Sequence, residues 1–294
     1  MLFKTKNFSQ DALDHFRELQ RLSFSILENM AATLQEGQTE RDVAKALVKA
    51  YRAAGTGSFF HLPVVLFAER TALPDDGDKK WKTGNFFPKS RALKKGDSVI
   101  MDAAPLFKGY LVDTSYSFCF GDNPKHAEMM GNLAGFRDQV CRAVNEGQTF
   151  KAIADKVGSD IRAMGYEPVH QKHPGEVLGH RTLKIANLPF DWRLQGFDGV
   201  ALTWFGWKEK LAQSGWGKHS PLWNESKTSD HAPHDGLWLV EPHAGDGPVG
   251  AKWEEILVID NGKARWLDDN PPHVYQWSQI AKGLGYGPRS KSEA

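Results

Sequence analysis

The feature that most restricts the fold of this chain is an internal repeat. Residues 34–55 align without a gap to residues 144–165, and Glu-Gly-Gln-Thr occurs in both copies, at 36–39 and 146–149. Self-similarity of this kind indicates two related supersecondary units. Each half is expected to contain a helix, the Glu-Gly-Gln-Thr connection, a second helix and a β-hairpin. The repeat therefore predicts a pseudo-twofold α+β domain.

The helices of the two halves have ordinary start signals. Ser9 precedes a long amphipathic run, and Thr39 and Thr149 can each cap the helix that follows its glycine. The apolar positions of the first run are expected in the core: Leu13, Phe16, Leu19, Leu22, Ile26 and Met30.

Two aspartates lie in the segment 97–121, which is typical of a β-hairpin interrupted by Pro105 and Gly109. If the turn is centred within residues 106–109, Asp102 and Asp113 face the same side, with Cβ atoms roughly 5 Å apart. That spacing would let them share an ion.

Two glutamates repeat this arrangement nearer the C-terminus. Glu241 and Glu254 each interrupt an apolar strand, and a Gly/Pro-rich loop joins the strands. Uncompensated carboxylates in strands cost several kcal/mol of desolvation, and because no matching Arg or Lys is expected beside the four, metal is the expected partner. Four carboxylates with one imidazole, His180, suit two divalent ions of Mn, Fe, Co or Zn. Taken singly, each of these residues is more often a turn, cap or surface residue.

The ordered set resembles the pita-bread metallopeptidase superfamily, which includes methionine aminopeptidases, Xaa-Pro aminopeptidases, prolidases and creatinase. The similarity spans roughly residues 10–267 and is strongest at 96–118 and 240–254. It implies a pita-bread fold, with the duplicated halves around a curved antiparallel sheet. The implied metal ligands of a dinuclear centre are Asp102, Asp113, His180, Glu241 and Glu254.

The resemblance also implies how the ligands divide. Asp102 would chelate one ion, Asp113 and Glu254 would bridge, and His180 with Glu241 would complete the other coordination sphere. Glu255 remains a rival to Glu254, because the register of that strand slips by one residue against the family pattern.

The chain departs from the family at two histidines that normally position the substrate amide. The first would fall near Asp75 and the second at Asn187 or Leu188. Losing them removes transition-state stabilisation and argues against ordinary aminopeptidase turnover. Candidate replacements are His61, His173 and His243, of which His243 is expected at the rim of the site, although a structural or exposed role is weighed above a catalytic one for each. Two smaller departures from the family pattern are Tyr116, where the pattern has an arginine, and Ala104, where it has a glycine.

The resulting prediction is a dinuclear hydrolase acting on a C–N bond of a small peptide-like or amide substrate, and not a standard aminopeptidase. Glu241 would bind metal and carry the proton to the leaving amine. His243 and His61 are the other candidate catalytic residues. The alternatives are Fe or Mn redox chemistry on the same ligands, and a non-catalytic binding module that uses the cleft.

Residues 1–267 are expected to form one catalytic domain with an aromatic-rich insertion at 190–235, and residues 268–294 a C-terminal extension with a loose tail. Six of the ten tryptophans lie between 192 and 238. The insertion is expected to form a pocket wall for an apolar or aromatic ligand, and a homodimer interface is an equal alternative.

Composition sets softer limits. With 294 residues and 40% hydrophobic content, the chain can bury a full core. A net charge of +1 gives no reason to expect nucleic acid or an anionic membrane as a partner, and no run approaches the roughly 20 apolar residues of a membrane span. Two cysteines and the absence of a signal-peptide pattern predict a cytoplasmic protein.

Overall fold

The computed structural model describes residues 2–74, 85–186, 193–194, 196–216 and 219–284. Its helices are α1 (Gln10–Thr33), α2 (Glu40–Ala53), α3 (Pro124–Leu133), α4 (Gly135–Asn145), α5 (Phe150–Ala163), α6 (Gly199–Gln213) and α7 (Pro272–Ala281), with 3-10 turns η1 (Ala68–Ala72), η3 (Val169–Lys172) and η4 (Lys227–Ser229). None of these described helices is long and apolar enough to cross a membrane.

The strands fall into two groups along the chain. The first comprises β1 (Phe3–Lys4), β2 (Ser58–Phe59), β3 (Val64–Phe67), β4 (Ser98–Ala103), β5 (Pro105–Phe107), β6 (Tyr110–Leu111) and β7 (Thr114–Cys119). The second comprises β8 (Glu167–Pro168), β9 (Val177–Arg181), β10 (Lys184–Ile185), β11 (Arg193–Leu194), β12 (Phe197–Asp198), β13 (Leu222–Asn224), β14 (Gly236–Val240), β15 (His243–Asp246), β16 (Val249–Lys252), β17 (Glu255–Asp260) and β18 (Lys263–Trp266).

The repeat appears as two matching helices. α2 and α5 begin and end at equivalent positions of the two copies. The predicted caps are confirmed: the Thr39 hydroxyl accepts from the Asp42 amide at 3.2 Å and the Thr149 hydroxyl from the Ala152 amide at 3.1 Å. Ser9 caps α1 in the same way. Such caps satisfy amides that the first helical turn leaves without partners.

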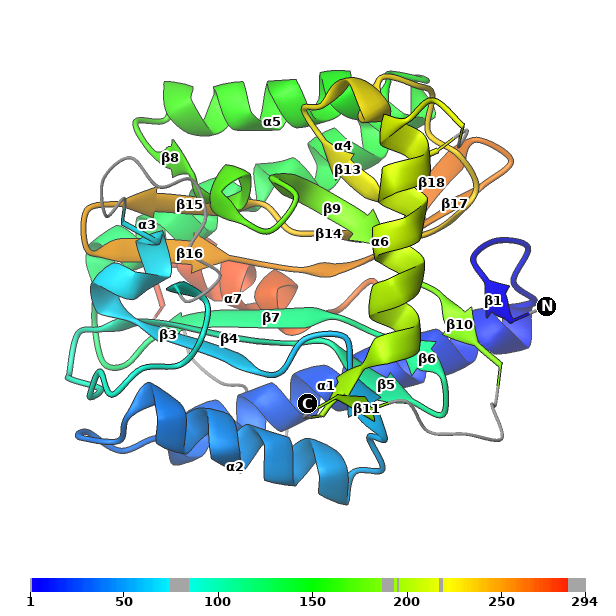
Figure 1. Ribbon diagram of the computed structural model, residues 1–294. Coiled ribbons are helices and arrows are strands. Elements are labelled where there is room, and N and C mark those ends of the chain that lie inside the picture. Colours follow the sequence, from blue (N-terminus) through cyan, green and yellow to red (C-terminus); the bar gives the residue numbers. More distant parts are fainter. Residues whose placement is uncertain (1, 75–84, 187–192, 195, 217–218, 285–294) are drawn as a thin grey trace.

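The central strands lie between the helices of the two halves (Figure 1). β3, β4 and β7 form one antiparallel sheet beside α1 and α2, and β13, β9, β14, β17 and β18 form another beside α4 and α5. An isolated bridge between Ser115 and Glu254 connects the two sheets. α6 runs across the front of the strands.

Two large apolar clusters lie beside the helices of the two halves, and the first also includes Leu237 and Leu239 of β14. In the first, residues such as Phe16, Tyr51 and Val65 are fully buried between α1, α2 and the sheet. In the second, Phe150 and Trp238 belong to an equivalent cluster between α5 and β14. Because burying one large apolar side chain stabilises by about 1.5–3 kcal/mol, these clusters hold the helices on the sheets.

The predicted register of the aspartate hairpin is wrong by one residue at the turn. The turn is formed by Lys108 and Gly109, both with positive φ (48° and 83°). The ladder therefore pairs Asp102 with Ser115, not with Asp113. Since a shift of the turn by one residue moves each partner by two, Asp102 and Asp113 become diagonal neighbours and still face the same side.

The tryptophans around the insertion have different environments. Trp223 and Trp238 are fully buried, and Trp223 stacks on Phe150 with ring centroids 4.1 Å apart. Trp207 and Trp216 are 64% and 88% exposed. Trp192 and the predicted loose tail, GPRSKSEA, lie outside the described residues. Residues 272–281 of the C-terminal extension form α7, whose His273 and Gln276 are buried.

Candidate metal centre

His180 is positioned by the close approach of two strands. It lies on β9, which pairs with β14 so that Gly179 stands opposite Val240. A Cβ atom at position 179 would lie 2.2 Å from the carbonyl oxygen of Leu239, so only glycine allows this pairing. The His180 side chain is thereby fixed in the middle of the sheet.

The two glutamates face each other across a continuous hairpin. Val240 pairs with Glu255 and His243 with Lys252, and the same register between these pairs places Glu241 opposite Glu254. Glu255 points the other way and accepts hydrogen bonds from Arg137 (2.7 Å) and His273 (2.9 Å). The structure therefore turns Glu254, and not Glu255, toward the aspartates.

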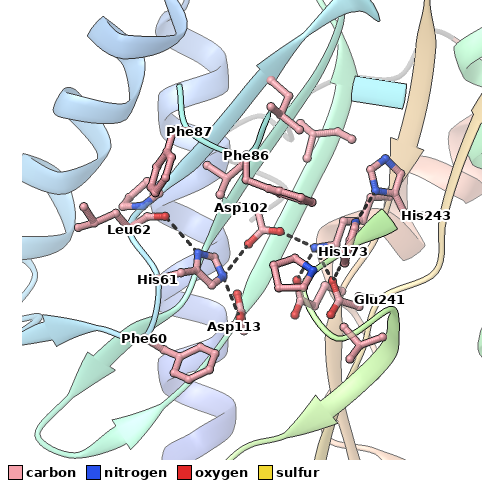
Figure 2. A pocket seen from close by; sticks show the side chains of 18 of the residues that line it. Phe60, His61, Leu62, Phe86, Phe87, Asp102, Asp113, His173, Glu241 and His243 are labelled. Atoms are coloured by element: carbon pink, nitrogen blue, oxygen red, sulfur yellow. Dashed lines mark hydrogen bonds and ion pairs between the residues drawn. The ribbon is translucent and has the colours of Figure 1, made fainter. Parts of the chain in front are cut away.

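All five predicted ligands gather at one pocket. The Nε2 atom of His180 lies 3.5 Å from Asp113 Oδ2 and 3.9 Å from Glu254 Oε1. The ligand atoms of Asp113, His180 and Glu254 lie within 4.8 Å of one another, as do those of His61, Asp102 and Asp113. Figure 2 shows Asp102 and Asp113 on one side of the pocket and Glu241 on the other.

Lys252 corrects the expectation that no lysine or arginine accompanies the carboxylates. Its Nζ atom lies 2.8 Å from Glu241 Oε2 and 3.0 Å from Glu254 Oε2, and it donates to Asp102. The residue is 3% exposed. Lys252 and Glu254 are two apart on a strand and so share a face, a signal that the sequence contained.

The charges act on one another strongly. Burial would raise the pKa of Asp113, but the imidazoles of His61 and His180 lower it below its ordinary value. Burial and the Asp113 charge raise the pKa of Glu254 well above its usual range. Burial would lower the pKa of His61, but Asp113 raises it to about 9. The site therefore mixes charged and protonated groups within one enclosed space.

The histidines form two separate arrangements. His61 Nε2 lies 3.1 Å from Asp113 Oδ2, at the mouth of the pocket. His173 lies between Glu241 and His243, 2.9 Å from the carboxylate and 2.8 Å from the imidazole. His243 also bonds the Thr71 carbonyl at 2.7 Å and is 1% exposed, so its predicted place at the rim is wrong. His173 takes the position beside Glu241 because η3 places it there.

The pocket has a cavity of about 340 Å³ with an apolar wall. Its polar floor is the carboxylate group, and its wall is lined by Phe60, Leu62, Val64, Phe86, Phe87, Pro174, Phe197 and Leu202, among others. The insertion thus reaches the pocket through Phe197 and Leu202, and Phe205 packs on His180 with ring centroids 5.8 Å apart. Trp204 and Trp207 are not among the lining residues.

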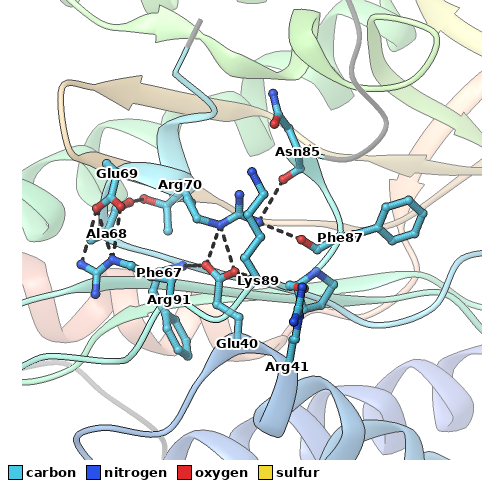
Figure 3. A network of polar contacts seen from close by, with 12 residues as sticks. Glu40, Arg41, Phe67, Ala68, Glu69, Arg70, Asn85, Phe87, Lys89 and Arg91 are labelled. Carbon is cyan, nitrogen blue, oxygen red and sulfur yellow. Dashed lines mark hydrogen bonds and ion pairs between the residues drawn. The ribbon is translucent and has the colours of Figure 1, made fainter. Parts of the chain in front are cut away.

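A buried ionic network positions the segment that carries Phe86 and Phe87, two residues of the apolar wall (Figure 3). Glu40, on α2, accepts from Arg70 (2.8 Å) and from the Lys89 amide (2.7 Å). Arg70 in turn donates to the carbonyls of Asn85 (3.1 Å) and Phe87 (2.9 Å). The segment that carries Phe86 and Phe87 is thereby attached to the first half of the molecule.

The donor set fits a divalent cation. Asp113 Oδ1 and Glu254 Oε1 are buried and accept no hydrogen bond from any residue within the described ranges. Buried acceptors without partners are costly, and carboxylate oxygens with one imidazole suit divalent ions such as Mn, Fe, Co or Zn. Asp75, Asn187 and Leu188, where family histidines are missing, lie outside the described residues.

Comparison with known proteins agrees with this geometry. The sequence profile of metallopeptidase family M24 matches residues 14–188. An uncharacterized peptidase of Staphylococcus aureus (strain MSSA476) is 25% identical over 176 residues, which are 59% of this chain and 44% of that protein. A relative from Staphylococcus saprophyticus is 24% identical over 59% of this chain and 47% of its own length. The chain thus spans less than half the length of these curated relatives.

Solved structures show the same fold. A dipeptidase from Pyrococcus horikoshii OT3 has a TM-score of 0.63 at 18% identity, covering 90% of this chain and 61% of that one. The X-Pro aminopeptidase of Thermotoga maritima MSB8 also gives 0.63, at 17% identity and coverages of 90% and 62%. Methionine aminopeptidase from Rickettsia prowazekii gives 0.61 at 13% identity, covering 90% and 99%. The predicted α+β pita-bread fold is confirmed.

Proposed function

Because the chain belongs to metallopeptidase family M24, we propose that it is a metal-dependent hydrolase that cleaves a C–N bond of a small peptide-like or amide substrate. The observation that carries this proposal is the convergence of four carboxylates and His180 at the floor of one apolar pocket. The ligands proposed are Asp102 to chelate, Asp113 and Glu254 to bridge, and His180 with Glu241 to complete the set.

The metal supplies Lewis-acid chemistry and a nucleophilic water at neutral pH when it is bound. Glu241 is proposed to carry a proton to the leaving amine, and its contact with His173 supports this, since the imidazole holds the carboxylate in one orientation. His61, across the pocket, is proposed to donate a hydrogen bond to the carbonyl oxygen as negative charge develops there. His243 acts through His173, because it reaches Glu241 only by way of that ring.

Two ions are proposed in the carboxylate centre at saturation, with unequal affinities. Asp113, His180 and Glu254 offer atoms for a first ion without disturbing Asp102 or Glu241. The second ion must displace the Lys252 ammonium, which already compensates Asp102, Glu241 and Glu254. The lysine therefore weakens the second site relative to the first.

The substrate is proposed to place an apolar or aromatic group against the apolar wall of the pocket. Methionyl and Xaa-Pro peptides are expected to turn over about a hundredfold more slowly than with family members that retain both missing histidines, the size of effect seen when one oxyanion donor is lost. Rapid cleavage of these peptides would contradict that expectation and would mean that other residues fully compensate for the two histidines.

The test is hydrolysis by protein that has been stripped of metal and reloaded separately with Mn, Fe, Co or Zn. Peptides and amides with a phenylalanyl or leucyl group next to the scissile bond should be cleaved by the wild type. They should not be cleaved by Asp113→Asn, whereas Asp246→Asn, a change at an exposed carboxylate outside the pocket, should keep activity. Metal-loaded wild type that cleaves no C–N bond in such a panel would refute a hydrolase.

A further inference from the structure

Three imidazoles converge on the face of β9 and β14 that is turned away from the pocket. His219 precedes β13, and His231 and His234 precede β14. Their ring centroids are 3.9 Å apart for His219 and His234, 4.6 Å for His231 and His234, and 5.1 Å for His219 and His231. One nitrogen from each lies within 4.8 Å of the others. None of the three lines the carboxylate pocket.

His231 and His234 have ring nitrogens that are available for a ligand. His231 Nδ1 donates to the Ala232 carbonyl at 3.0 Å, so its Nε2 carries the lone pair. Nothing among the described residues bonds that Nε2, nor either ring nitrogen of His234, although all three atoms are buried. A histidine that donates one N–H to a backbone carbonyl and keeps the other nitrogen free has the arrangement usual for a metal ligand. Burial, with the Arg181 charge, also lowers the pKa of His234 to about 2, which keeps its ring neutral.

We propose that His219, His231 and His234 bind one divalent ion of the zinc class, separate from the carboxylate centre. Three imidazole nitrogens with one water form a tetrahedral site, and the exposed side of His219 leaves that fourth position to solvent. At Zn–N distances of about 2.0–2.1 Å, the nitrogens would be roughly 3.4 Å apart, which small side-chain rotations achieve from the present positions. The absence of a carboxylate among the three donors selects against Mg²⁺, Ca²⁺ and Mn²⁺.

Arg181 is the charge that opposes a cation here, and its contacts show how the site tolerates it. The guanidinium donates to the Asp235 carbonyl at 2.7 Å and lies 4.2 Å from the centre of the Trp238 ring. These contacts hold it against β14 and give its charge other partners. Because the Arg181 charge does not favour a cation, the bonds to the three imidazoles would have to hold the proposed ion.

The site would fasten the end of the insertion to the core. His219 follows α6 in the chain, and the Phe150 ring contacts the rings of both His231 and His234, with ring centroids 5.6 Å apart in each case. The Phe150 amide also donates to the His231 carbonyl at 3.1 Å. One ion would thus join the segment after α6 to the segment before β14 and to the start of α5. The proposed ion would therefore have a structural role, distinct from the proposed hydrolysis.

The experiment counts zinc in an Asp113→Asn background, in which the carboxylate centre is weakened. After dialysis against a defined free Zn²⁺ concentration, Asp113→Asn should hold one more equivalent than Asp113→Asn/His219→Ala. Zinc should also raise the thermal midpoint of the first protein by several degrees and not that of the second. His15→Ala, which removes a histidine from the surface of α1, is the matched control and should change neither result.

His219 is exposed, so its loss should leave the fold intact, and His231→Gln provides a second variant with the same expected loss. Cobalt substitution adds a spectroscopic check, since a tetrahedral site gives visible absorption that both variants should lose. Equal zinc content with and without His219 would overturn the proposal. Loss of all zinc on Asp113→Asn alone would also overturn it, because the ion would then belong to the carboxylate centre.

Discussion

Lys252 places a fixed positive charge among the ligands proposed for the ions. Its ammonium contacts three of the four carboxylates. Charges this close interact by about 4 kcal/mol even at an effective dielectric constant near 20. In Lys252→Met, the second ion should therefore bind at least about tenfold more tightly, as measured by calorimetric titration. The metal-free variant should unfold more easily, because carboxylates that lose a buried partner cost about 3–5 kcal/mol.

Lys263→Met, at an exposed position on β18, is the control for that experiment and should alter neither quantity. Two ions of equal affinity in the wild type, unchanged by Lys252→Met, would show that the lysine does not compete. Removal of both ions by Asp113→Asn would still support shared coordination by that carboxylate.

His61 is proposed as the donor that replaces one of the two family histidines predicted to be absent. It faces Asp113 from the wall of the pocket and is 32% exposed at its side chain, so it can meet a substrate. His61→Ala should lower kcat by about a hundredfold or more, as expected for one lost oxyanion donor, while metal content stays constant. A change in KM alone would assign His61 to binding only.

His126, which is not part of the proposed metal centre, should make the unfolding free energy depend on pH. Burial lowers its pKa to about 3, and its Nε2 is 3.1 Å from the Ser117 hydroxyl. The unfolded chain takes up this proton near pH 6.5 and the folded chain only near pH 3, so the contribution of His126 is present above pH 6.5 and is lost as pH falls. The slope of this loss is about 1.4 kcal/mol per pH unit.

Urea unfolding at pH 7, 6 and 5 tests this assignment. His126→Gln should flatten the pH dependence of the unfolding free energy by nearly that slope, and His15→Gln, on the surface of α1, should not. Parallel curves for wild type and His126→Gln would contradict a neutral buried imidazole.

Among the elements, those fixed by local signals are the ones that the sequence predicts well. The Glu-Gly-Gln-Thr repeat and the threonine caps locate α2 and α5, because capping chemistry acts within a few residues. The aspartate register is predicted less well, since the position of the turn depends on two residues, Lys108 and Gly109, that adopt positive φ. A one-residue difference there moves every pair in the ladder.

The candidate site shows the same division. The five proposed ligands could be found from their order in the chain, whereas His173 could be recognised only as a general candidate, because the 3-10 turn that delivers it has no strong sequence signal. The sequence spacing indicates that Lys252 shares a face with Glu254, whereas its contacts with Asp102 and Glu241 depend on the assembled sheet.

Helix α6 bears on both roles predicted for the insertion, a pocket wall and a homodimer interface. Leu202 lines the pocket, whereas Trp207 is largely exposed and is not among the lining residues, so only part of α6 can contribute to the predicted pocket wall. Leu202→Ala should raise KM for an apolar substrate about fivefold to thirtyfold, from the loss of about 1–2 kcal/mol of apolar contact. Trp207→Ala is the matched control and should leave KM unchanged.

Sizing chromatography of the same two variants tests the homodimer alternative. A lower mass for Trp207→Ala with normal turnover would assign the exposed face of α6 to subunit contact. An unchanged mass would remove the main apolar reason to expect such contact, since Trp207 and Trp216 are the most exposed of the tryptophans that the structure describes in that region.

For the whole molecule, the proposed ligands come from both halves, so metal should stabilise the folded state. An ion present at a hundred times its dissociation constant adds about 2.7 kcal/mol to the unfolding free energy. For a chain of this size, chelation should then lower the thermal midpoint by about 5 °C. Calorimetry of manganese-loaded protein with and without a chelator checks this, because the three imidazoles select against Mn²⁺, and Asp113→Asn should respond much less. A midpoint that is indifferent to chelation would contradict tight binding.

The bridge between Ser115 and Glu254 is an isolated backbone contact between the strand of the aspartates and the strand of the glutamates. The first half of the domain supplies only aspartates to the proposed centre and the second half supplies the histidine and both glutamates, so neither half alone holds the full ligand set. On this ligand set, a shift of one half against the other would change the number of oxygens that reach an ion. The affinity for metal would then depend on the alignment of the two halves, and each half would rely on the other for a complete site.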